Sequence, residues 1–217
     1  MSHSEAGTRR TGPRTTKGRA TSARIVEAAA QLIFERGVAG TTTGDIQEAA
    51  GVSSSQLYLY FPDKDMLIRA VIAHQTEALI NDQKALLSRL DSIEGLRAWR
   101  DFVVATQQAR GCLGGCPLGS LASELADHHP GARADLTSSF ARWEGAIRDG
   151  LQLMVSRGEL DRNADPAYLA MALLAALQGG MLLAQTRQDT SVLEAALDAM
   201  IERVALHATN RTPDTAI

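Results

Sequence analysis

Two short helices joined by a glycine turn are predicted in the stretch TTTGDIQEAAGVSSSQLYLYFPDK. Thr43 can cap a first helix that runs through Ala50, and Gly51 can adopt the positive φ of a sharp turn. Ser53 can cap a second short helix, which Pro62 ends. This spacing is typical of a helix-turn-helix, a motif whose second helix enters the major groove of DNA.

The second of these helices is expected to read DNA. A recognition helix presents its N-terminal side chains to base edges, and here these are Ser54, Ser55 and Gln56, of which Gln56 can bond adenine bidentately. Leu57 and Phe61, four residues apart, are expected to point into a core. A helical hairpin with a polar face is the alternative that this segment alone leaves open. The candidate DNA-binding residues are Arg24, Thr42, Thr43, Ser53, Ser54, Ser55, Gln56, Tyr58, Tyr60 and Lys64.

A helical period recurs along the remainder of the chain, and no strand-like alternation of any length appears. The sequence therefore predicts an all-α fold of about nine helices, with an N-terminal three-helix domain and a larger helical ligand-binding and dimerisation domain. Asp63 can cap the fourth helix. The predicted helices cover residues 22–36, 43–50, 54–60, 64–90, 93–110, 117–126, 130–157, 166–187 and 191–207.

Basic residues concentrate at the N-terminus. Residues 1–64 hold eight Lys or Arg against six Asp or Glu, a net charge of +2, which leaves −5 for the remainder. Five of the basic residues lie between Arg9 and Arg19, without apolar periodicity, and predict a mobile basic arm suited to phosphates or to a minor groove. A solvated tail is the alternative. The predicted domains are an arm over 1–19, a helix-turn-helix domain over 20–66, a helical effector-binding and dimerisation domain over 67–210, and a tail over 211–217.

The chain is long and apolar enough for a sizeable core, with 217 residues of which 45% are hydrophobic. No uninterrupted apolar run approaches the roughly 20 residues that span a bilayer. The first residues lack the apolar segment of a signal peptide. We therefore expect a cytoplasmic protein that does not bind a membrane.

The run from Thr43 through Leu67 resembles the DNA-binding signature of the tetracycline-repressor (TetR) family of bacterial regulators. The resemblance rests on the pairs Asp45-Ile46, Leu57-Tyr58 and Tyr60-Phe61 and on the run AAGVS at residues 49–53. It implies a homodimer of all-α subunits, each with a three-helix DNA-binding domain and a C-terminal domain that binds a small molecule and dimerises. Two departures are Gly44, where some members carry a base-reading side chain, and Ser54, where lysine is frequent. Base reading is therefore expected to rest on Ser55 and Gln56.

A second resemblance concerns the C-terminal domain. The runs GCLGGCPLGSLASEL at residues 111–125 and QGGM at residues 178–181 are similar to a subgroup of that family containing the LmrA and YxaF repressors. The resemblance implies an effector that is a drug-like or flavonoid-type aromatic molecule.

Aromatic side chains are scarce, yet four of them are expected to surround a ligand pocket. Trp99 with Phe102, and Phe140 with Trp143, are each three residues apart and share a helix face. Ordinary core packing is the alternative, and a filled core between these four residues would favour it, whereas a cavity would favour a sensor. The candidate ligand-binding residues are Trp99, Phe102, Thr106, Gln107, Phe140, Trp143, Leu174, Gln178 and Met181.

The last two predicted helices suit a subunit interface. The helix over 166–187 is apolar around most of its circumference, so it must be covered on more than one side. Paired with the final helix, it suits a four-helix bundle formed with a second copy; a buried intrachain hairpin is the alternative. Gly179 and Gly180 lie within this helix, where a partner helix or a ligand must approach the backbone. The candidate interface residues are Leu173, Leu177, Leu182, Leu193, Leu197, Met200, Ile201 and Val204.

The two cysteines, Cys112 and Cys116, and the pair His128 and His129 allow a thiol switch or a metal site to be considered. Zinc sites usually show a tighter cysteine pair, and a glycine-rich loop gives no rigid support. We therefore expect small packing cysteines, no metal and no cofactor. Phosphate-binding loops, nucleophile elbows and HExxH motifs are missing from the sequence, which argues against an enzyme.

These patterns predict a ligand-responsive transcriptional regulator. Two copies would place their recognition helices in successive major grooves, about 34–36 Å apart, on a near-palindromic operator. The expected partners are a double-stranded DNA operator, a second copy of the chain and a small aromatic or hydrophobic effector that releases a repressor from DNA. The alternatives are a DNA-binding protein without an effector, architectural or controlled by a protein partner, and a redox sensor that uses Cys112 and Cys116.

Overall fold

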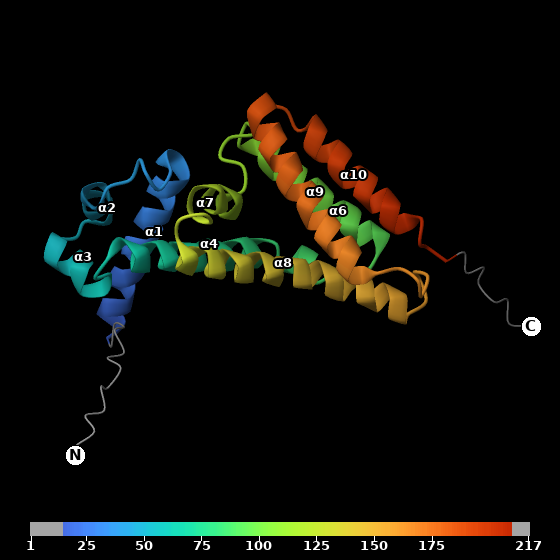
Figure 1. Cartoon of the computed structure of the whole chain (residues 1–217), viewed down its shortest axis with the longest axis horizontal. Coiled ribbons are helices and arrows are strands. Elements are labelled where there is room, and N and C mark those ends of the chain that lie inside the picture. Colours follow the sequence, from blue (N-terminus) through green and yellow to red (C-terminus); the bar gives the residue numbers. More distant parts are fainter. Residues whose placement is uncertain (1–14, 210–217) are drawn as a thin grey trace, which may run out of the picture. The chain divides into compact units, whose positions relative to one another are not determined.

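The computed structural model describes residues 15–209, and every regular element longer than a single bridge in that range is an α-helix (Figure 1). This confirms the all-α fold. The chain divides into two compact units, Met1–His74 and Gln75–Ile217, with the division inside the fourth helix. The helices are α1 (Thr16–Arg36), α2 (Thr43–Ala50), α3 (Ser54–Tyr60), α4 (Lys64–Asp82), α5 (Lys84–Leu87), α6 (Ile93–Ala109), α7 (Pro117–Leu125), α8 (Pro130–Ser156), α9 (Pro166–Arg187) and α10 (Ser191–Ala205).

The first unit is built around α1, which packs against α2, which in turn packs against α3. One apolar side chain from each helix is almost fully enclosed: Ile25 of α1, Ile46 of α2 and Leu57 of α3. Phe61 is also buried, so the prediction that Leu57 and Phe61 point into a core is confirmed. Burial of this kind contributes roughly 1.5–3 kcal/mol per large apolar side chain and fixes the angle between α2 and α3.

Local capping chemistry explains the turn between α2 and α3. Gly51 follows α2 with φ of 60° and ψ of 46°, the left-handed conformation that glycine adopts without steric cost. Ser53 then caps α3, as predicted. The cap of α2, however, is Thr42 and not Thr43, because Thr42 is the residue with extended backbone whose hydroxyl accepts from Asp45 N.

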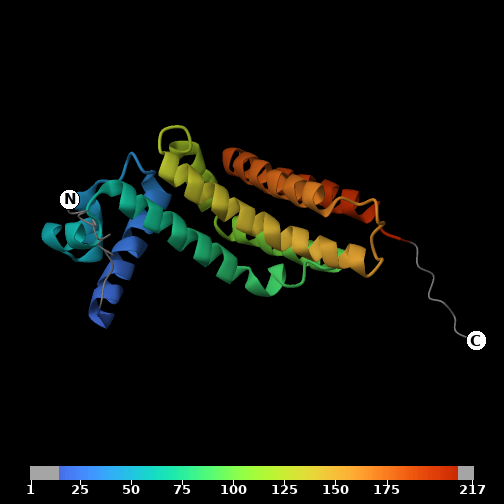
Figure 2. The same cartoon turned by 60° about the horizontal axis from the view of Figure 1, so that its bottom comes forward.

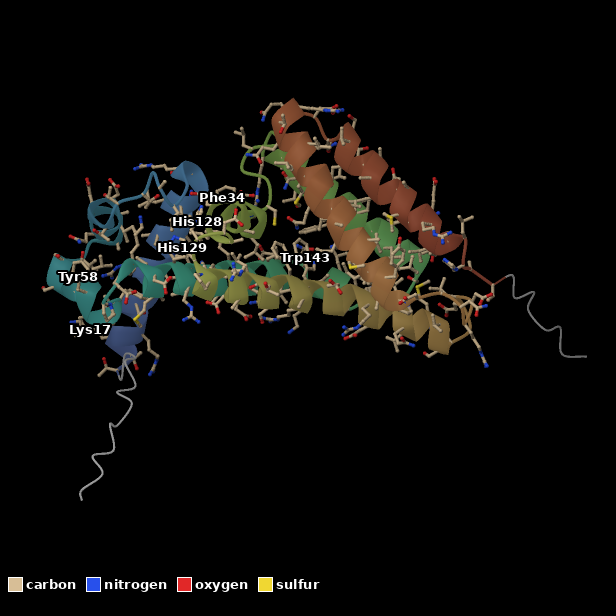
Figure 3. The ribbon with its side chains drawn as sticks, in the orientation of Figure 1. Lys17, Phe34, Tyr58, His128, His129 and Trp143 are labelled. Atoms are coloured by element: carbon tan, nitrogen blue, oxygen red, sulfur yellow. The ribbon has the colours of Figure 1, made fainter. Side chains whose placement is uncertain are left out.

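The first helix is longer than predicted. It begins at Thr16, where Thr15 caps it by accepting from Gly18 N, and Lys17 therefore lies within α1 (Figure 3). Residues 16–19 of the predicted arm are thus helical. The remainder of the arm, residues 1–14, and the predicted tail over 211–217 lie outside the described residues.

The predicted helix over 64–90 is divided into α4 and α5, so the described residues contain ten helices where about nine were predicted. Gln83 lies at the break and is buried. Its Oε1 accepts a hydrogen bond of 2.8 Å from Trp99 Nε1 of α6. The break between α4 and α5 therefore coincides with a contact between two residues that are 16 positions apart in the sequence. Helical periodicity alone does not reveal such a contact.

In the second unit, α9 packs against both α8 and α10, and α10 also packs against α6. Figures 1 and 2 show α9 and α10 side by side. Gly180 allows this close approach, because a Cβ on it would lie 3.0 Å from the Leu193 Cα of α10. Gly179, by contrast, faces open space. Of the two glycines, Gly180 is the one that a partner helix of the same chain approaches.

Within residues 15–209, α9 is the one helix long and apolar enough to cross a membrane by length and composition. No segment of bilayer-spanning length was predicted from the sequence. Its inner side is occupied by Leu169, Leu173 and Leu177, all at most 2% exposed. Packing in the core of the second unit therefore accounts for much of its apolar character.

Candidate nucleic-acid interface and ligand cavity

Helix α3 presents most of its side chains to solvent. Leu57 is its one buried residue, whereas Ser54, Ser55 and Gln56 are exposed. Tyr58 is 47% exposed and is labelled on α3 in Figure 3. Leu59, which the sequence reasoning did not select, is 73% exposed. The sequence pattern could have identified Leu59, because a leucine interrupts the otherwise polar exposed side of α3.

The first turn of α3 is held by a reciprocal capping box. Ser53 Oγ accepts from Gln56 N at 3.2 Å, and Gln56 Oε1 accepts from Ser53 N at 3.0 Å. Ser53 Oγ also lies 3.0 Å from Ser55 Oγ. A bidentate contact with adenine requires both the oxygen and the nitrogen of the amide. Because the Gln56 oxygen is occupied in this conformation, the predicted bidentate reading requires the cap to open first.

The basic residues Lys64 and Arg24 bind the backbone of their own unit. Lys64 Nζ donates to Val38 O at 3.1 Å and to Thr41 O at 3.0 Å, on the segment that leads into α2. Arg24 Nε donates to Ala50 O at 2.8 Å, at the C-terminal end of α2. These bonds anchor both ends of α2. Through these hydrogen bonds, Lys64 and Arg24 position α2. A contact of the two side chains with DNA phosphates stays a prediction.

The start of α2 carries a second capping box. Thr42 Oγ1 donates to Asp45 Oδ2 at 2.6 Å, and Thr42 N donates to the same oxygen at 2.9 Å. These two hydrogen bonds hold the pKa of Asp45 below its ordinary value, because they favour the ionised carboxylate. Thr43 follows as the first residue of α2 and is half-buried, as is Tyr60 near the end of α3.

The second unit contains a cavity of about 120 Å³ between α4, α6, α8, α9 and the segment before α7. Of the four aromatic residues predicted to surround a pocket, Phe102 and Trp143 border this cavity. Five predicted ligand-binding residues line it, namely Phe102, Thr106, Gln107, Trp143 and Met181. Residues that the sequence reasoning missed include Gln75, Asp82, Gln83, Arg110 and Cys116. Most of these come from α4 or from loops, whose approach to α6 has no periodic signal in the sequence.

Four predicted ligand-binding residues do not border the cavity: Trp99, Phe140, Leu174 and Gln178. Trp99 is fully buried and is turned to Gln83, so it supports the cavity wall from behind. Leu174 of α9 is buried away from the cavity. Phe140 of α8 is half-buried and also lies outside the cavity lining. Three-residue spacing placed each aromatic pair on one helix, but an α-helix turns about 300° in three residues, so the two side chains need not face the same space.

Two polar atoms of the cavity wall have no hydrogen-bond partner in the described part of the chain: Gln107 Oε1 and Trp143 Nε1. Gln107 is 2% exposed and Trp143, labelled in Figure 3, is 1% exposed. A buried polar atom without a partner costs about 1–3 kcal/mol, so such atoms are rare in folded proteins. Both atoms belong to residues that line the cavity, and each is enclosed by the surrounding protein. Gln178 Nε2 is a third unpaired buried atom, outside the lining.

Both cysteines are buried and unbridged. Burial raises the pKa of the Cys116 thiol, and the nearby backbone of Gly119 and Leu118 opposes this less strongly. A thiol held in its protonated form reacts slowly with oxidants, which weakens the redox alternative. His128 and His129 precede α8 (Figure 3). Within residues 15–209, no three His, Cys, Asp or Glu side chains gather into a metal-binding group.

Most residues of the predicted dimer interface on α9 and α10 are buried within the subunit, and their role in a dimer stays a prediction. Six of its residues are at most 2% exposed within the subunit and belong to the core between α9, α10 and their neighbours: Leu173, Leu177, Leu193, Leu197, Ile201 and Val204. Met200 is half-buried. Leu182 is 63% exposed, so it is the one predicted residue that is openly presented. The sequence could not separate the two sides, because α9 is apolar on both.

The outer side of α9 carries its own apolar residues. Tyr168, Met171, Leu182 and Leu183 are between 43% and 63% exposed, and Leu153 of the neighbouring α8 is 51% exposed. We call the four residues of α9 the outer apolar face; Leu153 lies instead beside α4 and α5, with Ile80 and Leu87. Exposed apolar groups gathered on one side of a helix are typical of a protein–protein contact.

Comparisons with known proteins agree along most of the chain. A family described as "Bacterial regulatory proteins, tetR family" matches residues 25–71, and one described as "Tetracyclin repressor-like, C-terminal domain" matches residues 92–200. The chain is 30% identical over 187 residues to an uncharacterized HTH-type transcriptional regulator in the lacX 3′ region of Lactococcus lactis subsp. lactis, covering 84% of this chain and 92% of the relative.

Two further similarities extend this result. The HTH-type transcriptional repressor DhaR of Mycobacterium sp. (strain GP1) is 25% identical over 183 residues, covering 82% of this chain and 89% of the relative. The crystal structure of a TetR transcriptional regulator from Chloroflexus aurantiacus J-10-FL superposes with a TM-score of 0.75 at 25% identity, covering 89% of this chain and 98% of that chain.

Proposed function

Because the chain belongs to the TetR family of DNA-binding, non-enzymatic transcriptional regulators, we propose that it is a repressor released from its operator by a small molecule. The carrying observation is the cavity of about 120 Å³ in the second unit, whose lining residues include Gln107 and Trp143, each with a buried polar atom that has no partner among the described residues. A repressor without an effector would be more stable if side chains filled this cavity and if these polar atoms had hydrogen-bond partners. The printed name of the relative DhaR, a repressor, supports the direction of control.

The DNA-binding surface is proposed to be the exposed side of α3. Ser54 and Ser55 in its first turn can contact base edges, and Tyr58 can donate to a phosphate. Leu59 adds a contact of a different kind, because an exposed apolar side chain in the major groove can pack against the methyl group of thymine. Gln56 and Lys64 act chiefly by holding α3 and α2 in place.

The dimer is proposed to form through the outer apolar face of α9 and not through α10. A second copy that covers Tyr168, Met171, Leu182 and Leu183 would pair the two α9 helices within a helical bundle. Gly179 lies on α9 with open space around its Cα, so a facing helix can approach closely there. The pairing would set the spacing of the two α3 helices at about 34–36 Å on a near-palindromic operator.

Control is proposed to pass through α4. Four cavity-lining residues come from the end of this helix, namely Gln75, Ala78, Leu79 and Asp82. The same helix begins with Lys64, which binds the backbone before α2. A ligand that favours the non-binding state by about 1–3 kcal/mol would weaken DNA affinity about 5- to 150-fold. Its place of action is proposed to be the cytoplasm.

A gel-shift titration of the full-length protein tests this function. We expect tight, sequence-specific binding to the DNA upstream of its own gene, with Kd on the order of 10⁻⁸–10⁻¹¹ M, and much weaker binding to a scrambled duplex of equal length. Equal affinity for both duplexes would contradict operator recognition. Ligands that occupy the cavity should then release the DNA; a variant with the cavity filled, Val103→Phe, should bind DNA and no longer respond.

A further inference from the structure

A pair of buried hydroxyl groups joins α4 to α8 within the second unit. Thr76 Oγ1 of α4 donates to Ser139 Oγ of α8 at 2.8 Å. We infer that this hydrogen bond, the α4–α8 lock, holds α4 at one position along α8, and that this locked position is the one that binds operator DNA. The inference rests on the proposed function, in which control passes through α4. Thr76 and Ser139 are thus positioning residues, which act on DNA binding through α4.

Both hydroxyls lie among apolar side chains. Thr76 is 6% exposed and Ser139 is 7% exposed. Thr76 is the one buried polar residue of α4, and Ser139 is the one hydroxyl-bearing residue among the buried residues of α8. Apolar side chains would pack at these positions without the loss of hydration that a buried hydroxyl incurs. A buried polar pair favours one arrangement of two helices over others, because only that arrangement brings donor and acceptor together.

The direction of the hydrogen bonds makes Thr76 the donor. Ser139 Oγ donates its own hydrogen to Asp135 O at 2.8 Å, one turn earlier on α8. The Ser139 oxygen then acts as the acceptor, and Thr76 supplies the hydrogen between the helices. Valine has a shape similar to that of threonine but no hydroxyl, so Thr76→Val removes this interhelical bond with little change in volume.

A second contact between the same two helices is exposed. Arg142 Nη2 of α8 donates to Glu77 Oε2 of α4 at 3.1 Å, and Arg142 Nη1 donates to Glu77 Oε1. The two side chains are 47% and 58% exposed. Ion pairs in contact with water stabilise a structure little. The buried hydroxyl pair therefore makes the main distinction between positions of α4 along α8.

The lock lies on two helices that both border the cavity. Gln75, Ala78 and Leu79 of α4 line the cavity, as does Trp143 of α8, one turn after Ser139. A hydrogen bond of 2.8 Å is lost once its two oxygens are more than about 3.5 Å apart. Helix shifts of about 1–2 Å accompany many allosteric transitions. A ligand that moves α4 from α8 by this amount would break the lock.

The first turn of α4 supports assigning the locked position to the DNA-binding state. In the same structure, Lys64 Nζ holds the segment before α2 through Val38 O and Thr41 O. An α4 that samples several positions spends only part of its time in the one that suits DNA. The apparent affinity falls by that fraction.

Gel shifts with the full-length protein and the DNA upstream of its own gene test the lock. Thr76→Val and Ser139→Ala should each weaken operator binding about fivefold or more, because one net hydrogen bond corresponds to roughly this factor. The double variant should bind no more weakly than the weaker single variant, because both substitutions remove the same bond. Unchanged or tighter binding by Thr76→Val overturns the inference, and so do two losses that add in the double variant.

Thr76→Ser separates the lock from general stability. It keeps the hydroxyl and loses a buried methyl group, so it should lower the free energy of unfolding without a comparable loss of operator affinity. Urea denaturation followed by circular dichroism measures the stability of each variant. If Thr76→Ser weakens operator binding as much as Thr76→Val does, affinity follows stability and the lock is refuted.

Thr190→Val is the matched control in the same unit. Thr190 is also 6% exposed, and its hydroxyl donates to Glu194 Oε1 at 2.7 Å and accepts from Gln108 Nε2 at 3.2 Å. The substitution therefore removes a buried threonine hydroxyl that bonds α6 and α10 and not α4. It should lower stability and leave operator affinity unchanged. A loss of affinity equal to that of Thr76→Val would show that any lost hydroxyl in this unit has the same effect, which contradicts the lock.

DNA release by added compounds separates this inference from the proposed function. If Thr76→Val and Ser139→Ala weaken binding as expected while no compound releases DNA from the wild type, the lock stands and effector control fails. If a compound releases DNA from the wild type while both variants bind the operator as Thr190→Val does, effector control stands and the lock fails.

Discussion

The helix-turn-helix and the cavity differ in how their polar side chains are paired. In the first unit, Ser53 with Gln56 and Thr42 with Asp45 form closed capping boxes, and Lys64 binds two backbone carbonyls. In two residues that line the cavity, Gln107 Oε1 and Trp143 Nε1 are buried without partners among the described residues. Exposed polar groups can use water or one another, so their pairing says little about a partner. Buried ones cannot, so each unpaired buried atom carries a cost in stability that an exposed one does not.

The strongest test of this contrast compares the two tryptophans. Both are at most 1% exposed, but Trp99 bonds Gln83 and Trp143 has no partner in the described structure. Trp99→Phe should lower the free energy of unfolding by about 1–3 kcal/mol more than Trp143→Phe, because it leaves Gln83 Oε1 unpaired. Chemical denaturation followed by circular dichroism measures the difference. In a Trp99→Phe/Gln83→Leu double variant, part of the loss should be regained; equal losses in the two single variants would refute the contrast.

Lys64→Met should lower DNA affinity about tenfold on every sequence, because the ammonium that holds the segment before α2 is lost. Gel shifts at several salt concentrations separate positioning from phosphate contact. A positioning role leaves the slope of log affinity against log salt unchanged, whereas loss of a phosphate contact reduces it by about 1. Exposed Lys84 on α5 provides the control, since Lys84→Met should leave affinity unchanged.

The capping box of α3 predicts matched effects for two substitutions. Ser53→Ala should lower the free energy of unfolding by about 1 kcal/mol, and Gln56→Ala should do so by a similar or smaller amount. Both should weaken DNA binding uniformly across operator variants. If Gln56→Ala instead relaxes preference at a single base pair, Gln56 reads that base after leaving its cap.

Leu59→Ala should weaken operator binding about fourfold, from the loss of roughly 0.8 kcal/mol of apolar contact. The effect should depend on one thymine. Replacing that thymine by uracil removes its methyl group, so wild type and variant should then bind alike in the gel shift. An undiminished difference on every uracil-substituted operator would place Leu59 outside the base contacts.

The smallest expected effect concerns pH. The Thr42 hydrogen bonds lower the pKa of Asp45 from its ordinary 3.8, so this carboxylate stabilises the folded state above pH 3.8. That contribution is lost as the pH falls through the lowered pKa. The stability gap between wild type and Asp45→Asn should therefore shrink below pH 3.8, as measured by denaturant titration at several pH values. Other carboxylates titrate equally in both proteins; a constant gap would contradict the capping assignment.

Local chemistry made the helix-turn-helix predictable from sequence. Gly51, Ser53 and Pro62 act on their nearest neighbours, and Leu57 and Phe61 follow helical spacing. The second unit depends on contacts between distant residues. The division between α4 and α5 involves Trp99, far along the chain, and the inner side of α9 is decided by Leu193 of α10 meeting Gly180. A cavity is the space that four helices leave unfilled, and no single segment encodes it.

The chain contains only two tryptophans, and the cavity lining includes one of them, Trp143. In a Trp99→Phe background, all indole emission would come from Trp143. Its wavelength and intensity would respond to whatever accepts from its N–H. The protein thus carries an intrinsic optical reporter beside the proposed ligand cavity, usable for screening compounds without any attached dye.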